Sequence, residues 1–353
     1  MRGKPDQGRV VSVSLGHPSR DLSYTLGIAG FEFLVERRGV GGDLEKACAL
    51  VRELDGKVDA IGLGGVNLYY QFKDKFYPIR EGFRLAKCAT VTPVFDGSFV
   101  KRWVEPHVLE RLEGTDAVKL AGKRVILVSV LDRYYLGKKC AELGARVFIG
   151  DALFGLGIPL LFGSWRAFEM ASALLMPVLG RLPLRMIYPS PVLEEITPRS
   201  KEVSTTGAPL SRSCMRMFSG MNRSLLKSCD VFVGDLPMLL SAIFTLSQDL
   251  EGKTVITTTL SSSEEEHLLR RGLSKVITLG PRINGRSPGA NVLEALLFAL
   301  GRRIGFAKGE NGSLKQDPRW QGENNGIHAT VRLNAVDWLW LWERSGLGNY
   351  IPA

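Results

Sequence analysis

The sequence predicts an α/β fold: an N-terminal α/β domain followed by a Rossmann-like, doubly wound parallel sheet. Three observations support this prediction. A length of 353 residues gives room for two hydrophobic cores. Residues 123–151 show the pattern of a buried strand, a helix and a second buried strand. After residue 229, three more short apolar segments alternate with segments of helical spacing, which is typical of a parallel sheet.

The first domain is expected to cover residues 1–115. Short apolar or alternating runs predict strands at 10–15, 31–37, 58–63 and 91–95. Helical spacing predicts helices at 43–54, where Asp43 is the expected N-cap, and at 81–89 and 98–112. Residues 68–72 and 76–79 alternate around a short polar turn and predict a hairpin.

The second domain is expected to cover residues 116–304. Buried strands are predicted at 125–130, 146–150, 230–234, 253–259 and 275–279. Helices are predicted at 237–246, at 263–271 after a run of serines, and at about 288–300, with Pro288 at the first helical position. Two stretches fit neither domain: a basic insertion at about 200–229, and a tail at 305–353 that we expect to be mobile or to wrap a neighbouring molecule.

The turn after the first strand of the second domain is the expected cofactor loop. In dinucleotide-binding βαβ units, a carboxylate about 20 residues past this turn binds the ribose hydroxyls. Asp151 has that place relative to Asp132, which we expect to cap the helix, and Ser129 lies in the same turn. The early glycines that let a pyrophosphate approach the backbone are absent. Asp151 is therefore either a ribose ligand or a solvated carboxylate at the end of a strand.

The composition excludes several other classes of protein. The net charge is +10, but the basic segment at 181–227 has only two aromatic residues, Tyr188 and Phe218, and no nucleic-acid motif, so we expect no nucleic acid partner. The five cysteines are odd in number and have no C-x-x-C spacing, which predicts buried reduced thiols, and the four histidines show no metal spacing. The N-terminus has no apolar core and glycines and prolines break the apolar stretch 152–184, so we expect a cytoplasmic protein without membrane association.

Asp96 and Lys101 are the best candidates for proton transfer. They flank the start of a predicted helix, directly after a predicted strand, and Ser98 is the expected cap of that helix. A lysine beside a carboxylate can act as a general acid or base when its environment adjusts its pKa. The alternative is a capped helix with an exposed lysine.

Candidate substrate ligands follow two strands of the first domain. Asn67 and Tyr69 come after a buried strand that ends in Gly64-Gly65, where small residues let backbone approach a ligand, although a tight turn into a hairpin explains the same residues. Arg20 could hold a substrate carboxylate from the turn after the first strand, or form a local salt bridge with Asp21.

The segment 284–291 joins the last predicted strand to the last predicted helix. Asn284, Gly285, Arg286 and Asn291 lie in it, and a helix N-terminus beside an arginine is suited to a carboxylate or phosphate. Thr257 and Thr258 end a strand of the same sheet and could face a nicotinamide ring, although threonines are also good strand formers.

Several segments resemble a family of bacterial proteins named quinate 5-dehydrogenases, found mainly in anaerobic Gram-positive bacteria. The resemblance covers about residues 9–301. It is carried by VVSVSLGHPSRD, by TPVFDGSFVK, by LVSVLDRYYLG and most specifically by NGRSPGANVLEA. Residues 200–229 and the tail beyond about 305 depart from the pattern.

This resemblance implies a Rossmann-type domain and an NAD- or NADP-dependent oxidation of the hydroxyl of quinate or a related alicyclic hydroxy acid. In that interpretation Lys101 and Asp96 assist the proton. Ser129, Asp132, Asp151, Thr257, Thr258, Asn284 and Gly285 hold the cofactor; Arg20, Asn67, Tyr69, Arg286 and Asn291 hold the substrate. The chain has neither the glycine-rich loop nor the N-V-T-x-P-x-K stretch of well-studied shikimate and quinate dehydrogenases. A non-catalytic nucleotide- or anion-binding regulatory protein is the alternative, a membrane-surface protein using 152–228 is a third, and a homo-oligomer is compatible with each.

Overall fold

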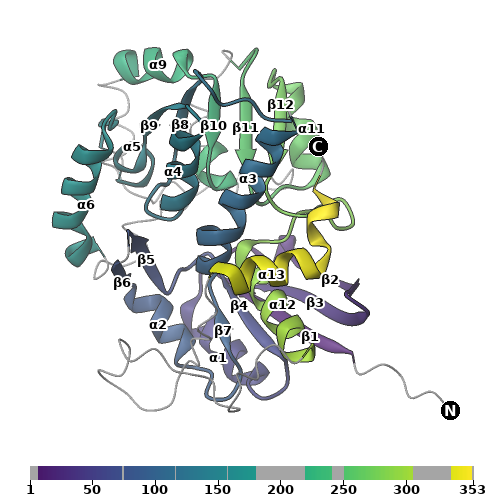
Figure 1. Cartoon of the computed structure of the whole chain (residues 1–353). Coiled ribbons are helices and arrows are strands. Elements are labelled where there is room, and N and C mark those ends of the chain that lie inside the picture. The colour runs from purple at the N-terminus through teal and green to yellow at the C-terminus, as the bar shows by residue number, and fades with distance from the viewer. Residues whose placement is uncertain are drawn as a thin grey trace. The chain divides into compact units, whose positions relative to one another are not determined.

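The computed structural model describes residues 7–73, 75–115, 117–156, 158–179, 219–240, 250–304 and 335–351. The chain forms two compact units (Figure 1). Unit 1 comprises Met1–Tyr70, Pro78–Val104 and Pro288–Ile351, and unit 2 comprises Gln71–Tyr77, Glu105–Ser287 and Pro352–Ala353. Both contain a five-stranded sheet with helices, which confirms the predicted α/β class.

Unit 1 is built on a mostly parallel sheet of strand order β2-β3-β1-β4-β7, in which only β2 is antiparallel to its neighbour. Its strands are β1 (Gly8–Ser14), β2 (Leu22–Ile28), β3 (Phe31–Gly39), β4 (Ala60–Gly64) and β7 (Val94–Phe95). Its helices are η1 (Pro18–Arg20), α1 (Leu44–Leu54), α2 (Arg80–Ala86), η2 (Val100–Val104), α12 (Ala290–Arg303), α13 (Ala335–Ser345) and η4 (Leu347–Tyr350). The strands β5 (Tyr69–Phe72) and β6 (Lys75–Pro78) form the predicted hairpin.

Helix α1 begins where the sequence predicted. The Asp43 carboxylate accepts hydrogen bonds from the backbone N–H groups of Glu45 and Lys46, both at 3.0 Å, and so satisfies two amides that the helix leaves free. The buried face of α1 includes Cys48, which forms a disulfide with Cys88 just after α2, with a Cα–Cα distance of 5.6 Å. This bond corrects the prediction of reduced thiols for these two residues. A separation of 40 residues carries no spacing signal, so only the fold reveals the pair.

Helix α12 belongs to unit 1, although we expected it in the second domain. It packs against β1 and β4, and its Phe298 ring lies 4.8 Å from the Phe95 ring. A glycine permits this close packing, because a Cβ at Gly62 would lie 2.8 Å from the Asn291 carbonyl oxygen. Helix α12 is assigned to unit 1 because of these long-range contacts, although it follows the strands of unit 2 in the sequence.

The end of the chain is helical, which corrects the expectation of a mobile tail for its last part. Helix α13 packs against α12 and η2. Trp338 and Trp342 are at most 1% exposed, and Trp338 stacks on Phe99 with ring centroids 5.6 Å apart. Residues 305–334 lie outside the described part.

Unit 2 contains a five-stranded parallel sheet of order β12-β11-β10-β8-β9, and Figure 1 shows these strands side by side. Every predicted strand of this sheet is present: β8 (Arg124–Leu127), β9 (Arg146–Ile149), β10 (Val231–Val233), β11 (Thr254–Thr257) and β12 (Lys275–Thr278). From β8 the chain moves to β9 on one side and later returns to β10 on the other. The order therefore reverses between β8 and β10, where open α/β sheets bind ligands at the carboxyl ends of the strands.

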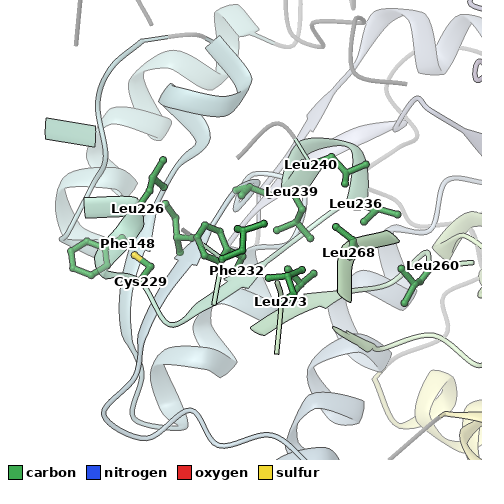
Figure 2. Packing of buried hydrophobic residues seen from close by; sticks show 14 residues of the cluster. Phe148, Leu226, Cys229, Phe232, Leu236, Leu239, Leu240, Leu260, Leu268 and Leu273 are labelled. Carbon is green, nitrogen blue, oxygen red and sulfur yellow. The ribbon is translucent and has the colours of Figure 1, made fainter. Parts of the chain in front are cut away.

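The helices of unit 2 are α3 (Glu105–Gly114), α4 (Tyr134–Glu142), α5 (Asp151–Leu156), α6 (Trp165–Leu179), α9 (Ser219–Ser228) and α11 (Ser262–Arg270). Helix α11 begins with a capping box between Ser261 and Glu264. Phe232 of β10 lies at the centre of the core, with Leu226 and Cys229 on one side and Leu268 and Leu273 on the other (Figure 2). The long segment of this unit starts at Glu105, eleven residues before the expected start at residue 116, because α3 packs against α4.

Two predicted features of unit 2 are only partly described. Residues 180–218, which include most of the basic insertion, lie outside the described ranges, and so does the end of the helix predicted at 237–246. Within the ranges that are described, no helix has both the length and the apolar character needed to cross a bilayer.

Candidate functional site

Two neighbouring strand ends in unit 1 bring the predicted catalytic and substrate residues together. Asn67 follows β4 and Asp96 follows β7; these strands are parallel and paired, so their carboxyl ends meet at one edge. Lys101, in η2, donates a hydrogen bond from its ammonium group to the Asn67 amide oxygen at 3.0 Å. Asn67, Asp96 and Lys101 are each at most 8% exposed. The cluster is therefore a built feature of the fold and not a capped helix with an exposed lysine.

Asp96 organises the backbone around this cluster. Its carboxylate accepts hydrogen bonds from the Leu68 N–H at 2.7 Å, the Ser98 N–H at 3.0 Å and the Ser98 hydroxyl at 2.8 Å. Ser98, the expected helix cap, thus donates to Asp96. The intervening Gly97 has φ of +89°, and a Cβ there would lie 2.7 Å from Ala290. Asp96 and Gly97 together fix the turn that leads into the helix carrying Lys101.

Tyr69 and Glu294 complete the unit 1 cluster. The Tyr69 hydroxyl is hydrogen-bonded to Ser98, and burial, together with the nearby carboxylates Asp96 and Glu294, raises the pKa of the phenol well above its usual value. Glu294, from α12, accepts a hydrogen bond from the Phe99 N–H at 3.0 Å. Burial and the charge of Asp96 raise the pKa of Glu294 well above 4.5. Glu294 was not predicted, although a single acid within the apolar run VLEALLFAL was the available signal.

This arrangement suits proton transfer to or from a bound hydroxyl group. It brings a buried ammonium, a buried phenol and a carboxyl whose pKa is raised into one region of unit 1, each held by its own hydrogen bonds. Positioned acid–base groups of this kind accelerate reactions about 10²–10⁴-fold.

The other unit 1 candidates lie in different surroundings. The Asn291 side-chain amide donates to the Ser12 hydroxyl of β1 at 2.8 Å, and so joins α12 to the sheet. The expectation that α12 begins at Pro288 is wrong, since its first residue is Ala290 and Gly289 is its N-cap. Near η1, Asp21 pairs with Arg37 at 2.7 Å. The local salt bridge between Arg20 and Asp21 stays a prediction. A substrate role for Arg20 and Asn291 stays a prediction.

In unit 2, Asp151 directly follows β9, as the sequence predicted. Its carboxylate, however, binds the backbone of the expected cofactor loop. Its two carboxylate oxygens accept hydrogen bonds from the backbone N–H groups of Val130 at 2.8 Å and Leu131 at 2.7 Å. Burial outweighs these bonds and raises the pKa of Asp151 to about 6. The interpretation of Asp151 as a merely solvated carboxylate is thus wrong. The backbone amides that would bind a phosphate are therefore already bound to the Asp151 carboxylate.

A buried ionic cluster occupies the edge of the unit 2 sheet where the strand order reverses. The Arg133 guanidinium binds Glu105 at 3.0 Å and also binds Asp132. Its remaining nitrogen lies 3.4 Å from the Thr258 hydroxyl, which itself donates to Glu105 at 3.0 Å. Asp235, after β10, lies 3.7 Å from Arg133. Three carboxylates thus surround one cation. Neither Glu105 nor Arg133 was predicted, because the contact between them joins residues 28 positions apart.

Asp132 does not cap α4 as expected. The N-cap of this helix is Arg133, which provides no side-chain cap, and the Asp132 carboxylate pairs with that arginine. Ser129 is buried, and its carbonyl accepts the Arg133 N–H at 3.2 Å. Thr257, next to Thr258, is 1% exposed, and its hydroxyl has no hydrogen-bond partner. This hydroxyl is the group at the end of β11 that could bind a ligand.

The segment 283–286 is a tight turn. Asn284 and Gly285 have φ of +50° and +76°, and the Gly285 carbonyl accepts a hydrogen bond from the Ser262 N–H at 2.8 Å. The turn therefore requires residues that tolerate positive φ, which explains Asn and Gly there without a ligand. Arg286 pairs through its backbone with Ile283. A ligand role for Asn284, Gly285 and Arg286 stays a prediction.

In the described ranges, no group of three or more His, Cys, Asp or Glu side chains is placed to hold a metal ion. The groups that could contact a nucleotide are the Val130 and Leu131 amides, once released by Asp151, and the Thr257 hydroxyl.

The two units define an α/β protein with one parallel and one mostly parallel sheet. A family model described as a domain of unknown function (DUF8754) matches residues 99–307, more than half of the 353 residues, so the chain belongs to that family. A second model, also described as a domain of unknown function (DUF8753), matches residues 9–96. No curated protein sequence matches the chain.

Solved structures show only distant similarity. N5,N10-methylenetetrahydrofolate dehydrogenase-cyclohydrolase from Trypanosoma brucei has a TM-score of 0.32 and 10% identity, over 84% of this chain and 87% of its own. The NAD-dependent malic enzyme from Thermotoga maritima has a TM-score of 0.33 and 12% identity, over 97% and 84%. A sugar transport substrate-binding protein from Bordetella parapertussis has a TM-score of 0.33 and 13% identity, over 86% and 83%. Similarity at this level assigns no function.

Proposed function

We propose that the protein is an NAD(P)-dependent oxidoreductase acting on the hydroxyl of quinate or a related alicyclic hydroxy acid. The observation that supports this proposal is the buried cluster of Asn67, Tyr69, Asp96 and Lys101, in which the Lys101 ammonium donates to the Asn67 amide at 3.0 Å. The resemblance to quinate 5-dehydrogenases supplies the substrate class.

The proposed chemistry of the chain itself is a proton transfer at the substrate oxygen. Oxidation of an alcohol removes the hydroxyl proton while hydride leaves the same carbon, and in the reverse direction the carbonyl oxygen receives a proton. Lys101 exchanges this proton: the neutral amine accepts it, and the ammonium returns it. Asn67 positions Lys101, and Tyr69 is the neutral hydrogen-bond donor beside them. A bound nicotinamide would supply the hydride chemistry.

The fit of the unit 2 loop to a dinucleotide depends on Asp151. A pyrophosphate can use the Val130 and Leu131 amides only after Asp151 releases both of them. In addition, three carboxylates lie around Arg133, and their charges repel a phosphate placed next to them. A dinucleotide that binds this loop must therefore displace the Asp151 carboxylate.

Turnover and binding together test the proposal. The purified protein is mixed with quinate and related alicyclic hydroxy acids and with each oxidised nicotinamide cofactor, and formation of the reduced cofactor is followed by absorbance. Lys101→Met is expected to lower kcat about 100-fold or more with little change in KM. Lys46→Met is the control, because Lys46 is a solvent-exposed lysine on α1, 73% exposed in its side chain. Full activity of Lys101→Met would exclude the assigned role, and absence of NADH and NADPH binding at millimolar concentration would exclude the oxidoreductase.

The second candidate function is a non-catalytic nucleotide- or anion-binding regulatory protein. It is favoured by the Asp151 contact, because a pair of backbone N–H groups that holds a carboxylate is chemically suited to an external anion. Calorimetry with ADP and with inorganic phosphate tests it. Binding without turnover on any hydroxy acid would favour this candidate, and lack of binding by both the wild type and Asp151→Asn would exclude it.

A further inference from the structure

Helix α6 presents an apolar face to solvent. Its inward side carries the buried residues Phe168, Ser172 and Met176, while Glu169 accepts a hydrogen bond from the Tyr134 hydroxyl at 2.8 Å. Its outward side consists of large apolar residues with high exposure: Met170 at 75%, Leu174 at 78%, Leu175 at 46% and Val178 at 58%. This is the reverse of the usual surface helix, whose exposed face is polar.

The outward residues have the spacing of a helix–helix seam. Ala167, Met170, Leu174 and Pro177 follow one another at intervals of three, four and three residues, which keeps them on one stripe. At roughly 200 Å² for a fully exposed large side chain, the four large residues expose about 500 Å². Two such faces together would bury about 1,000 Å², the lower bound for a specific protein–protein interface.

We propose that the outward face of α6 pairs with the same face of a second copy of this chain, as antiparallel helices about a two-fold axis. A two-fold interface requires a surface that complements itself, and an almost uncharged apolar stripe does so. Arg166, at the N-terminal end of α6, is the charged residue beside the stripe. Antiparallel pairing places each copy's Arg166 near the C-terminal end of the other α6, the negative end of the helix dipole.

A second copy explains this face better than a membrane surface does. Helices that lie on membranes carry lysines and arginines along a solvent-exposed polar side. The side of α6 opposite the stripe is packed within unit 2 instead, and its Glu169 carboxylate is neutralised by Lys138 and Lys73, both at 2.9 Å. Among the described side chains of α6, the large apolar ones of the stripe are those that stay exposed.

Light scattering after size-exclusion chromatography tests the pairing over a series of protein concentrations. The wild type is expected to be a dimer, and Leu174→Glu and Met170→Glu are expected to shift it to the monomer. Leu269→Glu is the matched control, because Leu269 is an apolar residue of α11 that is 42% exposed. It is expected to leave the dimer intact. Circular dichroism verifies that each variant remains folded.

Cysteine cross-linking gives a second readout that introduces no charge. Ala173 lies near the middle of α6, so its two copies approach each other at the two-fold axis. Ala173→Cys is expected to form a covalent dimer on mild oxidation, and Ser263→Cys, exposed on α11, is expected to form none. A wild type that is monomeric at all concentrations, or a dimer that persists in Leu174→Glu, would overturn the proposal. A monomer that sediments with anionic lipid vesicles would overturn it in favour of a membrane surface.

Discussion

Glu105 holds Arg133 across a distance of 3.0 Å in unit 2, and both side chains are at most 5% exposed. Glu105 begins α3 and Arg133 precedes α4, so this ion pair ties the first helix of the unit to the loop after β8. The Thr258 hydroxyl donates to Glu105 from the end of β11, at 3.0 Å. Three separate segments thus depend on one buried carboxylate.

Replacing Arg133 alone should lower the free energy of unfolding more than replacing Arg133 and Glu105 together. Arg133→Met leaves Glu105 buried without its cation and should lower the free energy of unfolding by about 3–5 kcal/mol. The double variant Arg133→Met with Glu105→Gln should recover part of this loss, since the glutamine is neutral. Urea unfolding measures both. A cost below about 1 kcal/mol for Arg133→Met would show that the pair does not hold the loop.

Asn67 and Lys101 should be energetically coupled. Asn67→Ala removes an acceptor from a buried ammonium and should lower the free energy of unfolding by about 1.5–3 kcal/mol. The same substitution made in Lys101→Met should cost clearly less, because no ammonium remains to be satisfied. A double-mutant cycle from urea unfolding gives the coupling directly. Equal costs in the two backgrounds would contradict the contact on which the proposed proton transfer depends.

Asp151 should make the protein less stable as the pH rises from about 4 to 6. Burial raises its pKa and the hydrogen bonds from Leu131 and Val130 lower it. Burial is the larger effect, so the pKa in the folded state is about 6, compared with an ordinary value of 3.8. The folded state therefore binds the proton more tightly than the unfolded state between these values. Ionisation of Asp151 should cost about 3 kcal/mol of stability by pH 7. The measurement is the unfolding free energy of the wild type minus that of Asp151→Asn, so that other titrations cancel.

Asp55 provides a control of opposite sign for this experiment. Burial acts to raise its pKa but is outweighed by hydrogen bonds from Thr90, Thr92 and Val91, so the pKa is lowered. Its stabilisation is present above pH 4 and is lost as the pH falls. The stability difference between the wild type and Asp55→Asn should therefore rise with pH, while that for Asp151→Asn falls. The same slope for both variants would contradict the assigned environments.

Gly97→Ala should be much more damaging than Gly41→Ala. Both glycines have positive φ, +89° and +63°, but only a Cβ at Gly97 meets backbone within 2.7 Å. Gly41→Ala should cost about 1–2 kcal/mol for the backbone conformation, and Gly97→Ala about 1–3 kcal/mol more for the steric conflict with α12. Thermal or urea unfolding of the two variants measures the difference. If both variants lose the same free energy of unfolding, α12 must shift to make room for the Cβ at residue 97.

The strands of unit 2 could be predicted because each one is a short apolar run bounded by turn residues. Val125–Val130 has this form, and its central residues are buried in β8. Strand β2 was not predicted, although Leu22, Tyr24, Leu26 and Ile28 alternate with polar or small residues. It lies at the edge of its sheet, paired on one side only, where that alternation is the sole signal.

The candidate site was predictable where it follows strand ends and not where it depends on distant partners. Asn67, Asp96 and Lys101 were singled out because each lies shortly after a predicted strand, whereas the pairing of β4 with β7 that brings them to one edge is visible only in the fold. Glu294 reaches the same cluster from α12, almost 200 residues further along; the apolar run around it marks it as unusual but does not indicate which residues it contacts. The same limit applies to Arg133 with Glu105, and to the assignment of Asp151, whose position was foreseen but whose hydrogen-bond partners were not.

The late position of α12 in the sequence has a consequence for biosynthesis. The strands β1 and β4 leave the ribosome early, whereas the helix that covers them follows roughly 230 residues after β4. During translation at about 5–20 residues per second, one side of the N-terminal sheet therefore stays uncovered for tens of seconds at the slower rate. A nascent chain of this kind should depend on a chaperone, and a truncated product ending before residue 290 should aggregate when it is released.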